Sequence, residues 1–262
     1  MNEQNEQHEE LTRVVEAPAL KMGIFKRIIA VIISPGELMA NIKEYPVILP
    51  PLILVIFLSL LSIPISIPYT LMIAEEMNNL MIERMLELGM DVSPLVAAAG
   101  HYGDAALVAA PNVNFLAIAN AIIAPVIISA FAAIGFWILT KIMRGRAKFT
   151  QYFSMYMHVM IVVTIGAAVQ AAIATSTGRL VDMTSLAAFI MPDGNISMVS
   201  FNILSAFNIF GIWAAVLTYI GVKIFNDFKI KAIVISAIAF LFGTAIMVAF
   251  MVIPFMMLNF EI

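Results

Sequence analysis

The chain has 262 residues, of which 62% are hydrophobic and 12% are charged, and its formal net charge is −3. Because a soluble domain has roughly half apolar and about a quarter charged residues, this composition excludes an ordinary soluble enzyme, a disordered protein and a nucleic-acid-binding module. The sequence contains no cysteine, which excludes disulfides, thiol catalysis and zinc–thiolate sites. We therefore expect an all-α fold embedded in a lipid bilayer.

The N-terminal region is predicted to lie outside the hydrocarbon core. Residues 1–19 are polar and acidic and predict a mobile cytoplasmic tail. The apolar stretch that follows Lys26 and Arg27 is far shorter than the roughly 20 residues needed to span a bilayer. We therefore expect residues 20–45 to form an interfacial helix and then a short juxtamembrane helix, which starts with a capping box within residues 34–37.

The remaining chain, residues 46–262, is predicted to be one membrane domain with five transmembrane helices. Pro64 and Pro68 mark an end or a kink of the first apolar run, and Pro125 marks a kink in the second. A mixed apolar and acidic stretch at 69–91 predicts an amphipathic helix outside the membrane. The runs long enough to span a bilayer are 47–67, 115–140, 151–174, 202–222 and 232–256.

Basic residues fall almost entirely on one side of these spans. Twelve lie before the first run, between the second and third, or between the fourth and fifth, whereas only Arg84 and Arg179 lie on the other side. Because positively charged loops stay in the cytoplasm, the N-terminus is predicted to be cytoplasmic and the C-terminus extracytoplasmic.

The expected spans contain no Asp, Glu, Lys or Arg. Their sequence therefore argues against a proton-coupled pump and against catalysis by buried acid–base pairs, and we assign no catalytic or cofactor-binding residue. We assign no metal site either, because His101 and Asp104 on a loop are too few ligands for a stable one.

Polar side chains follow one face of the third run. Gln151 and Ser154 precede His158 by seven and four residues, so the three share a helical face. They predict hydrogen bonds between helices, with a polar or proton-sensing lining as the functional alternative. The fourth run has a stripe of small and polar residues, which favours close helix packing over a narrow polar pathway. The stripe consists of Ser205, Asn208, Gly211, Ala215 and Thr218, and Gln170 of the third run completes the candidate polar set.

The basic residues on the inner side have two interpretations. Attraction to anionic headgroups, at about 1 kcal/mol per basic residue, accounts for much of their number. The alternative is a docking surface for a cytoplasmic partner. The candidate docking residues are Lys26, Arg27, Lys141, Arg144, Arg146, Lys148, Lys223, Lys229 and Lys231.

Three stretches carry a family resemblance: Ile33–Glu37 with the following Pro46, then Arg144–Ser154, then Phe207–Trp213 followed by Gly221 and Lys229–Ala232. They resemble a serine-proline-x-glutamate entry, a basic-glycine turn leading into the third span, and a phenylalanine/tryptophan fourth span with a basic turn. In this order they are similar to prokaryotic members of the Yip1-domain family of five-span membrane proteins. The resemblance covers about 20–256.

This chain also departs from the family pattern. His158 continues a helix where relatives often have a proline, and Asn208 stands where an acidic residue is common. The aspartate-leucine-tyrosine-glycine signature of the eukaryotic relatives that bind Rab-type GTPases is absent from the sequence, so the resemblance does not imply Rab binding.

The resemblance implies a non-enzymatic protein of the prokaryotic plasma membrane, and some bacterial relatives accompany ABC export or toxin-resistance systems. We therefore expect an accessory or scaffold protein that binds a membrane-protein partner such as an ABC transporter, without a cofactor or nucleic acid. A homo-oligomer is an alternative assembly. The alternative function is a permease or channel for a small solute or ion, which rests on His158, Gln170 and Asn208.

Overall fold

The computed structural model is almost entirely helical. In its described part, the one β-type contact is an isolated antiparallel bridge between Ser185 and Asn208, so the predicted all-α class is confirmed there. The expected tail at 1–19, the pair His101 and Asp104, and most of the outer loops lie outside the described residues. The structure describes residues 21–93, 110–178, 183–190 and 203–257.

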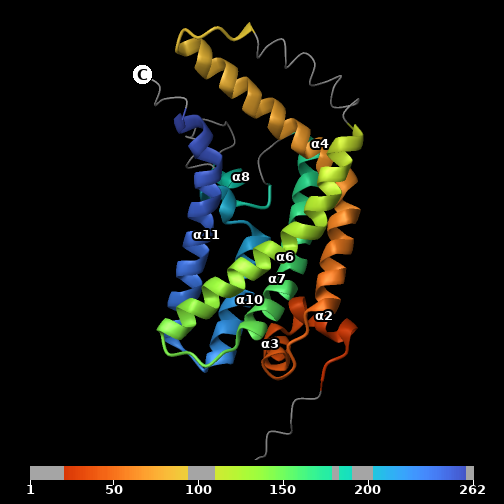
Figure 1. The fold of residues 1–262 in the computed structure, drawn as a ribbon, viewed down its shortest axis with the longest axis vertical. Helices are drawn as coiled ribbons and strands as arrows, with labels where there is room; N and C mark the ends of the chain where they lie inside the picture. The colour runs from red at the N-terminus through yellow and green to blue at the C-terminus, as the bar shows by residue number, and fades with distance from the viewer. Residues whose placement is uncertain (1–20, 94–109, 179–182, 191–202, 258–262) are drawn as a thin grey trace, which may run out of the picture.

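Two short helices lie at one end of the bundle, as predicted for residues 20–45 (Figure 1). Helix α2 (Ile24–Ile33) buries Val31 against the bundle but leaves Phe25 83% exposed. Its exposed apolar face is typical of a helix that lies on a membrane surface. Helix α3 (Pro35–Glu44) follows directly.

The capping box expected at the start of α3 does not form. Ser34 is the N-cap residue, but its side chain makes no capping hydrogen bond. Ser34 also ends α2, and its N–H donates to the Ala30 carbonyl at 3.1 Å. The donor that Glu37 would accept is therefore occupied, and Glu37 lies 4.0 Å from Lys26 instead.

Helix α4 (Leu49–Glu87) is one continuous helix of 39 residues. Its part Leu49–Met72 is long and apolar enough to cross a membrane, as expected for 47–67. The expectation that the amphipathic helix at 69–91 is separate was wrong, because the helix continues through Pro64 and Pro68. A proline inside a helix removes one backbone donor and bends the helix without ending it. Figure 1 shows the far part of α4 leaning away from the part beside the bundle.

Four described helices are long and apolar enough to cross a membrane, namely α4, α6 (Ala110–Ile142), α7 (Phe149–Thr177) and α10 (Ile209–Asn226). Helix α11 (Ile230–Met257) is also apolar, but its fully described part, Ile230–Ile246, is shorter than a span. The fifth transmembrane helix therefore stays a prediction.

Helix α10 begins at Ile209, seven residues later than the expected start at 202. Asn208 is its N-cap, and the backbone there pairs with the segment that precedes the short helix α8 (Leu186–Ile190). The Ile209 N–H donates to the Thr184 carbonyl at 3.2 Å. These hydrogen bonds fix the start of α10 at Ile209, although the apolar pattern of the sequence extends further towards the N-terminus.

Helix α7 forms the centre of the bundle and packs against α4, α6 and α10 (Figure 1). Its residues Tyr152, Met155 and Met157 are fully buried. Helix α3 packs against α10, and the Trp213 indole N–H of α10 donates to the Val31 carbonyl of α2 at 3.1 Å. Helices α2 and α3 therefore belong to the same packed body as the candidate spans.

Candidate functional site

The predicted polar face of α7 binds the backbone between α3 and α4. Gln151 Nε2 donates to the Lys43 carbonyl at 2.6 Å. Ser154 Oγ donates to the Val47 carbonyl at 2.7 Å and accepts the Val47 N–H at 3.1 Å. Because an unpaired buried backbone group is costly, these bonds stabilise the placement of residues 43–47 against α7.

His158 lies one turn further along the same face and is 1% exposed. Its Nδ1 lies 2.7 Å from the Ser154 carbonyl oxygen. Since a carbonyl oxygen only accepts, Nδ1 carries a proton and donates it in this bond. The other ring nitrogen, Nε2, makes no hydrogen bond to a described residue.

Arg27 is a buried cation at the base of the bundle, with 3% of its surface exposed. Its Nη2 donates to Asn41 Oδ1 at 2.5 Å and to the Tyr45 carbonyl at 2.9 Å, and its Nε donates to the Met22 carbonyl at 3.3 Å. Its Nη1 is buried without a hydrogen-bond partner among the described residues. Burial lowers the pKa of the guanidinium from its ordinary value, yet an arginine stays protonated in proteins.

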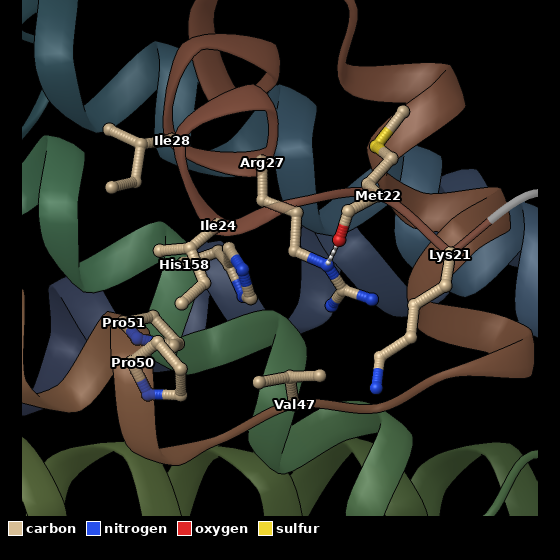
Figure 2. Close-up of a pocket in the computed structure, with 9 residues that line it drawn as sticks. All are labelled: Lys21, Met22, Ile24, Arg27, Ile28, Val47, Pro50, Pro51 and His158. Atoms are coloured by element: carbon tan, nitrogen blue, oxygen red, sulfur yellow. Dashed lines mark hydrogen bonds between the residues drawn. The ribbon is translucent and has the colours of Figure 1, made fainter.

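Arg27 and His158 line the same cavity, which has a volume of about 180 Å³ (Figure 2). The cavity lies between α2, the start of α4 and α7. Figure 2 shows Arg27, His158 and the two prolines Pro50 and Pro51 around this space, with Lys21 as a second cation at one side. Two basic side chains and one imidazole thus face a cavity that is otherwise mostly apolar.

A second buried polar group lies where α10 ends. Asn226 Nδ2 donates to the Tyr152 hydroxyl at 2.6 Å and to the Val222 carbonyl at 3.0 Å, and its Oδ1 accepts the Ala147 N–H at 3.0 Å. The loop between α6 and α7 comes close at Gly145, where a Cβ would lie 2.5 Å from Asn226 Oδ1. Asn226 therefore joins α10, α7 and this loop.

Asn208 and Thr218, two polar residues predicted for the fourth span, bond to nearby backbone groups, whereas Ser205 Oγ is buried without a partner among the described residues. Asn208 Oδ1 accepts the Gly211 N–H at 2.7 Å, and Asn208 Nδ2 donates to the Ser205 carbonyl at 3.1 Å. Thr218 Oγ1 donates to a carbonyl four residues earlier at 2.8 Å, and Ala215 is half-buried. Asn208 thus acts as an N-cap at the start of α10 rather than as a polar group inside a span.

A larger cavity of about 390 Å³ lies between α4, α6 and α7. Its hydroxyl groups include Ser62 and Ser66, which donate to carbonyls of α4 itself at 2.8 Å and 2.9 Å. Asn208 does not line it. Gln170 binds α4 separately, since its Nε2 lies 3.3 Å from the Tyr69 hydroxyl.

Arg27 is the exception among the nine candidate docking residues, because its side chain is buried and cannot contact a docked partner. Its guanidinium is held inside by the Met22 and Tyr45 carbonyls. The other eight are exposed, and their segments meet at the end of the bundle that carries α2 and α3 (Figure 1). They are Lys26, Lys141, Arg144, Arg146, Lys148, Lys223, Lys229 and Lys231, and we name them the basic end.

Comparison with known proteins identifies the family. The family model described as the Yip1 domain matches residues 29–252, which include the second half of α2, all of α3 to α10 and most of α11. The chain belongs to the Yip1 domain family. It is similar to the membrane protein YknW of Bacillus subtilis (strain 168), with 28% identity over 218 residues, or 81% of this chain and 84% of that protein. No solved structure gives a significant match.

In this Yip1 domain, the sequence prediction placed Arg27 on an exposed docking surface and did not single out Asn226. Both are buried, and each makes three side-chain hydrogen bonds. Arg27 precedes the buried Ala30 and Val31 by three and four residues, so it shares their helical face, and this spacing was the available signal. Asn226 had no such signal, because an asparagine after an apolar run is typical of a loop. Its partners come from other parts of the chain.

Proposed function

We propose that this Yip1 domain protein is a non-enzymatic accessory or scaffold protein of the prokaryotic plasma membrane. In this proposal it binds a membrane-protein partner, and an ABC exporter is the partner class that the family resemblance favours. The observation that supports the proposal most directly is the basic end, where eight exposed cations gather beside the packed helices α2 and α3.

The contacts at the basic end support a preformed docking surface. Lys43 Nζ lies 3.1 Å from Asp227 Oδ1, which links α3 to the turn between α10 and α11. Lys231 Nζ donates to the Met143 carbonyl at 3.1 Å, which links α11 to the loop after α6. A surface fixed by such links loses little conformational freedom when a partner with an acidic surface binds.

The test removes two charges from the basic end and measures partner capture in the native membrane. Arg146 and Lys229 are exposed and make no hydrogen bond to a described residue, so Arg146→Gln with Lys229→Gln leaves the fold intact. The control removes two exposed charges from the far part of α4, Glu75→Gln with Glu83→Gln. Crosslinking followed by mild extraction and mass spectrometry measures the recovered partner.

We expect the wild type and the α4 control to recover the same membrane protein, and the basic-end variant to recover several-fold less of it. If the wild type crosslinks only to lipid, or if both variants recover the partner equally, the docking proposal is wrong. If the wild type crosslinks only to lipid, the basic end contacts anionic headgroups and sets the orientation of the protein in the membrane, without binding a partner.

The alternative function is a permease or channel, and the partly polar cavity between α4, α6 and α7 is the observation that favours it. Flux of small solutes into vesicles that contain the purified protein tests this alternative. A flux that disappears in Ser62→Ala with Ser66→Ala, two changes in the wall of that cavity, would replace the scaffold proposal. We expect no flux above that of protein-free vesicles.

A further inference from the structure

The buried charge of Arg27 lacks a counterion among the described residues. The side-chain ion pairs Lys26–Glu37 and Lys43–Asp227 do not include Arg27. Its hydrogen bonds go to neutral oxygens, two backbone carbonyls and the Asn41 amide. Because an uncompensated buried charge is strongly unfavourable, this guanidinium favours an anion beside it.

The cavity beside Arg27 has the size and the donors for such an anion. Its volume of about 180 Å³ is well above the roughly 10–15 Å³ that one water molecule needs. Nη1 of Arg27 is a buried donor without a partner among the described residues, and Lys21 is a second basic residue in the wall. With its proton on Nδ1, the neutral His158 ring presents an acceptor at Nε2, so Arg27 and Lys21 are the donors in the wall. A guanidinium fork and a lysine are the groups that proteins use to bind phosphate.

The surroundings of the cavity indicate that the phosphate belongs to a lipid. Apolar side chains, including Ile24, Ile28 and Pro50, make up much of the wall. The outward face of α2 is also apolar, with Phe25 83% and Ile29 56% exposed. A helix with such a face lies at the boundary between headgroups and acyl chains, which places the cavity at the depth of the lipid phosphates.

We propose that the cavity between α2, α4 and α7 binds the phosphate of an anionic phospholipid, with Arg27 as its main ligand. Lys21 contributes charge, and the apolar wall contacts the start of the acyl chains. A free phosphate has the same anionic chemistry but makes no use of the apolar wall. This proposal is independent of the partner proposed for the basic end.

The experiment titrates the full-length protein in a neutral detergent with phosphatidylglycerol and counts bound lipids by native mass spectrometry. Diacylglycerol, which lacks the phosphate, is the control lipid, and inorganic phosphate is the competing free anion. Arg27→Gln removes the main ligand. Ile28→Trp fills the cavity while it leaves the hydrogen bonds of Arg27 in place. The matched control is Lys26→Gln, which removes a neighbouring exposed charge outside the cavity.

We expect one phosphatidylglycerol to bind the wild type and Lys26→Gln with equal affinity. Its affinity for both cavity variants is expected to be lower by about tenfold or more. Diacylglycerol is expected to show no such difference, and inorganic phosphate is expected not to displace the lipid. Thermal unfolding identifies any variant that fails to fold. If Arg27→Gln fails to fold, the binding of lipid by Ile28→Trp decides the test. Equal binding by Ile28→Trp and Lys26→Gln overturns the proposal. Displacement by millimolar inorganic phosphate overturns the lipid assignment and assigns the cavity to a free anion.

Discussion

Asn226 is a single residue that uses three of its side-chain hydrogen bonds to hold three segments together. One of its partners is the Ala147 N–H, and both residues are buried. Its other partners are the Tyr152 hydroxyl and a carbonyl of its own helix. Because these hydrogen bonds join separate segments of the chain, we expect Asn226 to stabilise the fold.

Substitution of Asn226 tests this structural role. Asn226→Leu leaves the Ala147 N–H and the Tyr152 hydroxyl without their partner, so we expect a loss of about 1–3 kcal/mol in the free energy of unfolding. Asn79→Leu makes the same chemical change at an exposed position of α4 and is expected to be nearly neutral. Unfolding in detergent micelles measures both, and equal stabilities would contradict the role.

Ser154 offers a second test at the same scale. Ser154→Ala removes both hydrogen bonds to Val47, so we expect faster backbone hydrogen exchange at residues 43–47 and a loss of about 1 kcal/mol. Ser176→Ala is the control, because Ser176 is exposed and donates only to a carbonyl of its own helix. Unchanged exchange at residues 43–47 in Ser154→Ala would show that other contacts hold this segment.

At the scale of elements, small residues set how closely the central helix approaches its neighbours. A Cβ on Gly166 of α7 would lie 2.6 Å from Cβ and Cγ of Phe210 in α10. These two atoms lie near the backbone and have little freedom to move aside. Gly135 of α6 has nothing within 4 Å of the same position. The sequence alone does not distinguish these two glycines, but only Gly166 lies at a close contact between helices.

This difference predicts opposite results for one substitution. Gly166→Ala forces α7 and α10 apart, so we expect a loss of about 1–3 kcal/mol. Gly135→Ala meets no neighbour and improves helix propensity, so we expect a gain of up to about 1 kcal/mol. Thermal unfolding of the two variants in the same detergent compares them directly. A neutral Gly166→Ala would mean that the helices separate without cost.

The sequence predicted the positions of those helices whose bounds depend mainly on the length of an apolar run and the residues that flank it. Helices α2, α3, α6 and α7 lie near their predicted ranges, because an apolar run bounded by Lys, Arg, Gly or Pro has few alternatives. The errors at α4 and α10 arose from tertiary contacts and context. Proline does not end a helix in lipid when neighbours satisfy its backbone, and the start of α10 is fixed by pairing between Asn208 and Ser185.

At the scale of the whole molecule, the basic residues of distant segments gather at one end of the bundle (Figure 1). The alternation of charged loops predicted this arrangement, because consecutive spans return the chain to the same side. The buried site at Arg27 was not predictable to the same degree. Its partner Asn41 lies in the following helix α3, and Tyr45 is the C-cap of that helix. His158 lies more than a hundred residues away in the sequence.

The predicted orientation is testable because the sequence has no cysteine, so a single introduced thiol gives the only labelling signal. Met90 follows α4 at one end of the bundle, and Arg146 lies in the loop between α6 and α7 at the other. We expect a membrane-impermeant thiol reagent to label Met90→Cys in intact cells, and to label Arg146→Cys only after the membrane is opened. The reverse pattern would invert the topology.

The hydrogen bonds between α7 and residues 43–47 have a consequence for biogenesis. The atoms that hold this segment belong to residues made 107 and 108 positions later. At a synthesis rate of about 5–20 residues per second, the segment waits roughly 5 to 20 seconds for its partners. During that time the later helices that α2 and α3 pack against, α7 and α10, are not yet made. The exposed apolar face of α2 suits contact with the membrane surface at this stage. A ribosome stalled before α7 would leave these two helices at the surface with their final partners not yet made.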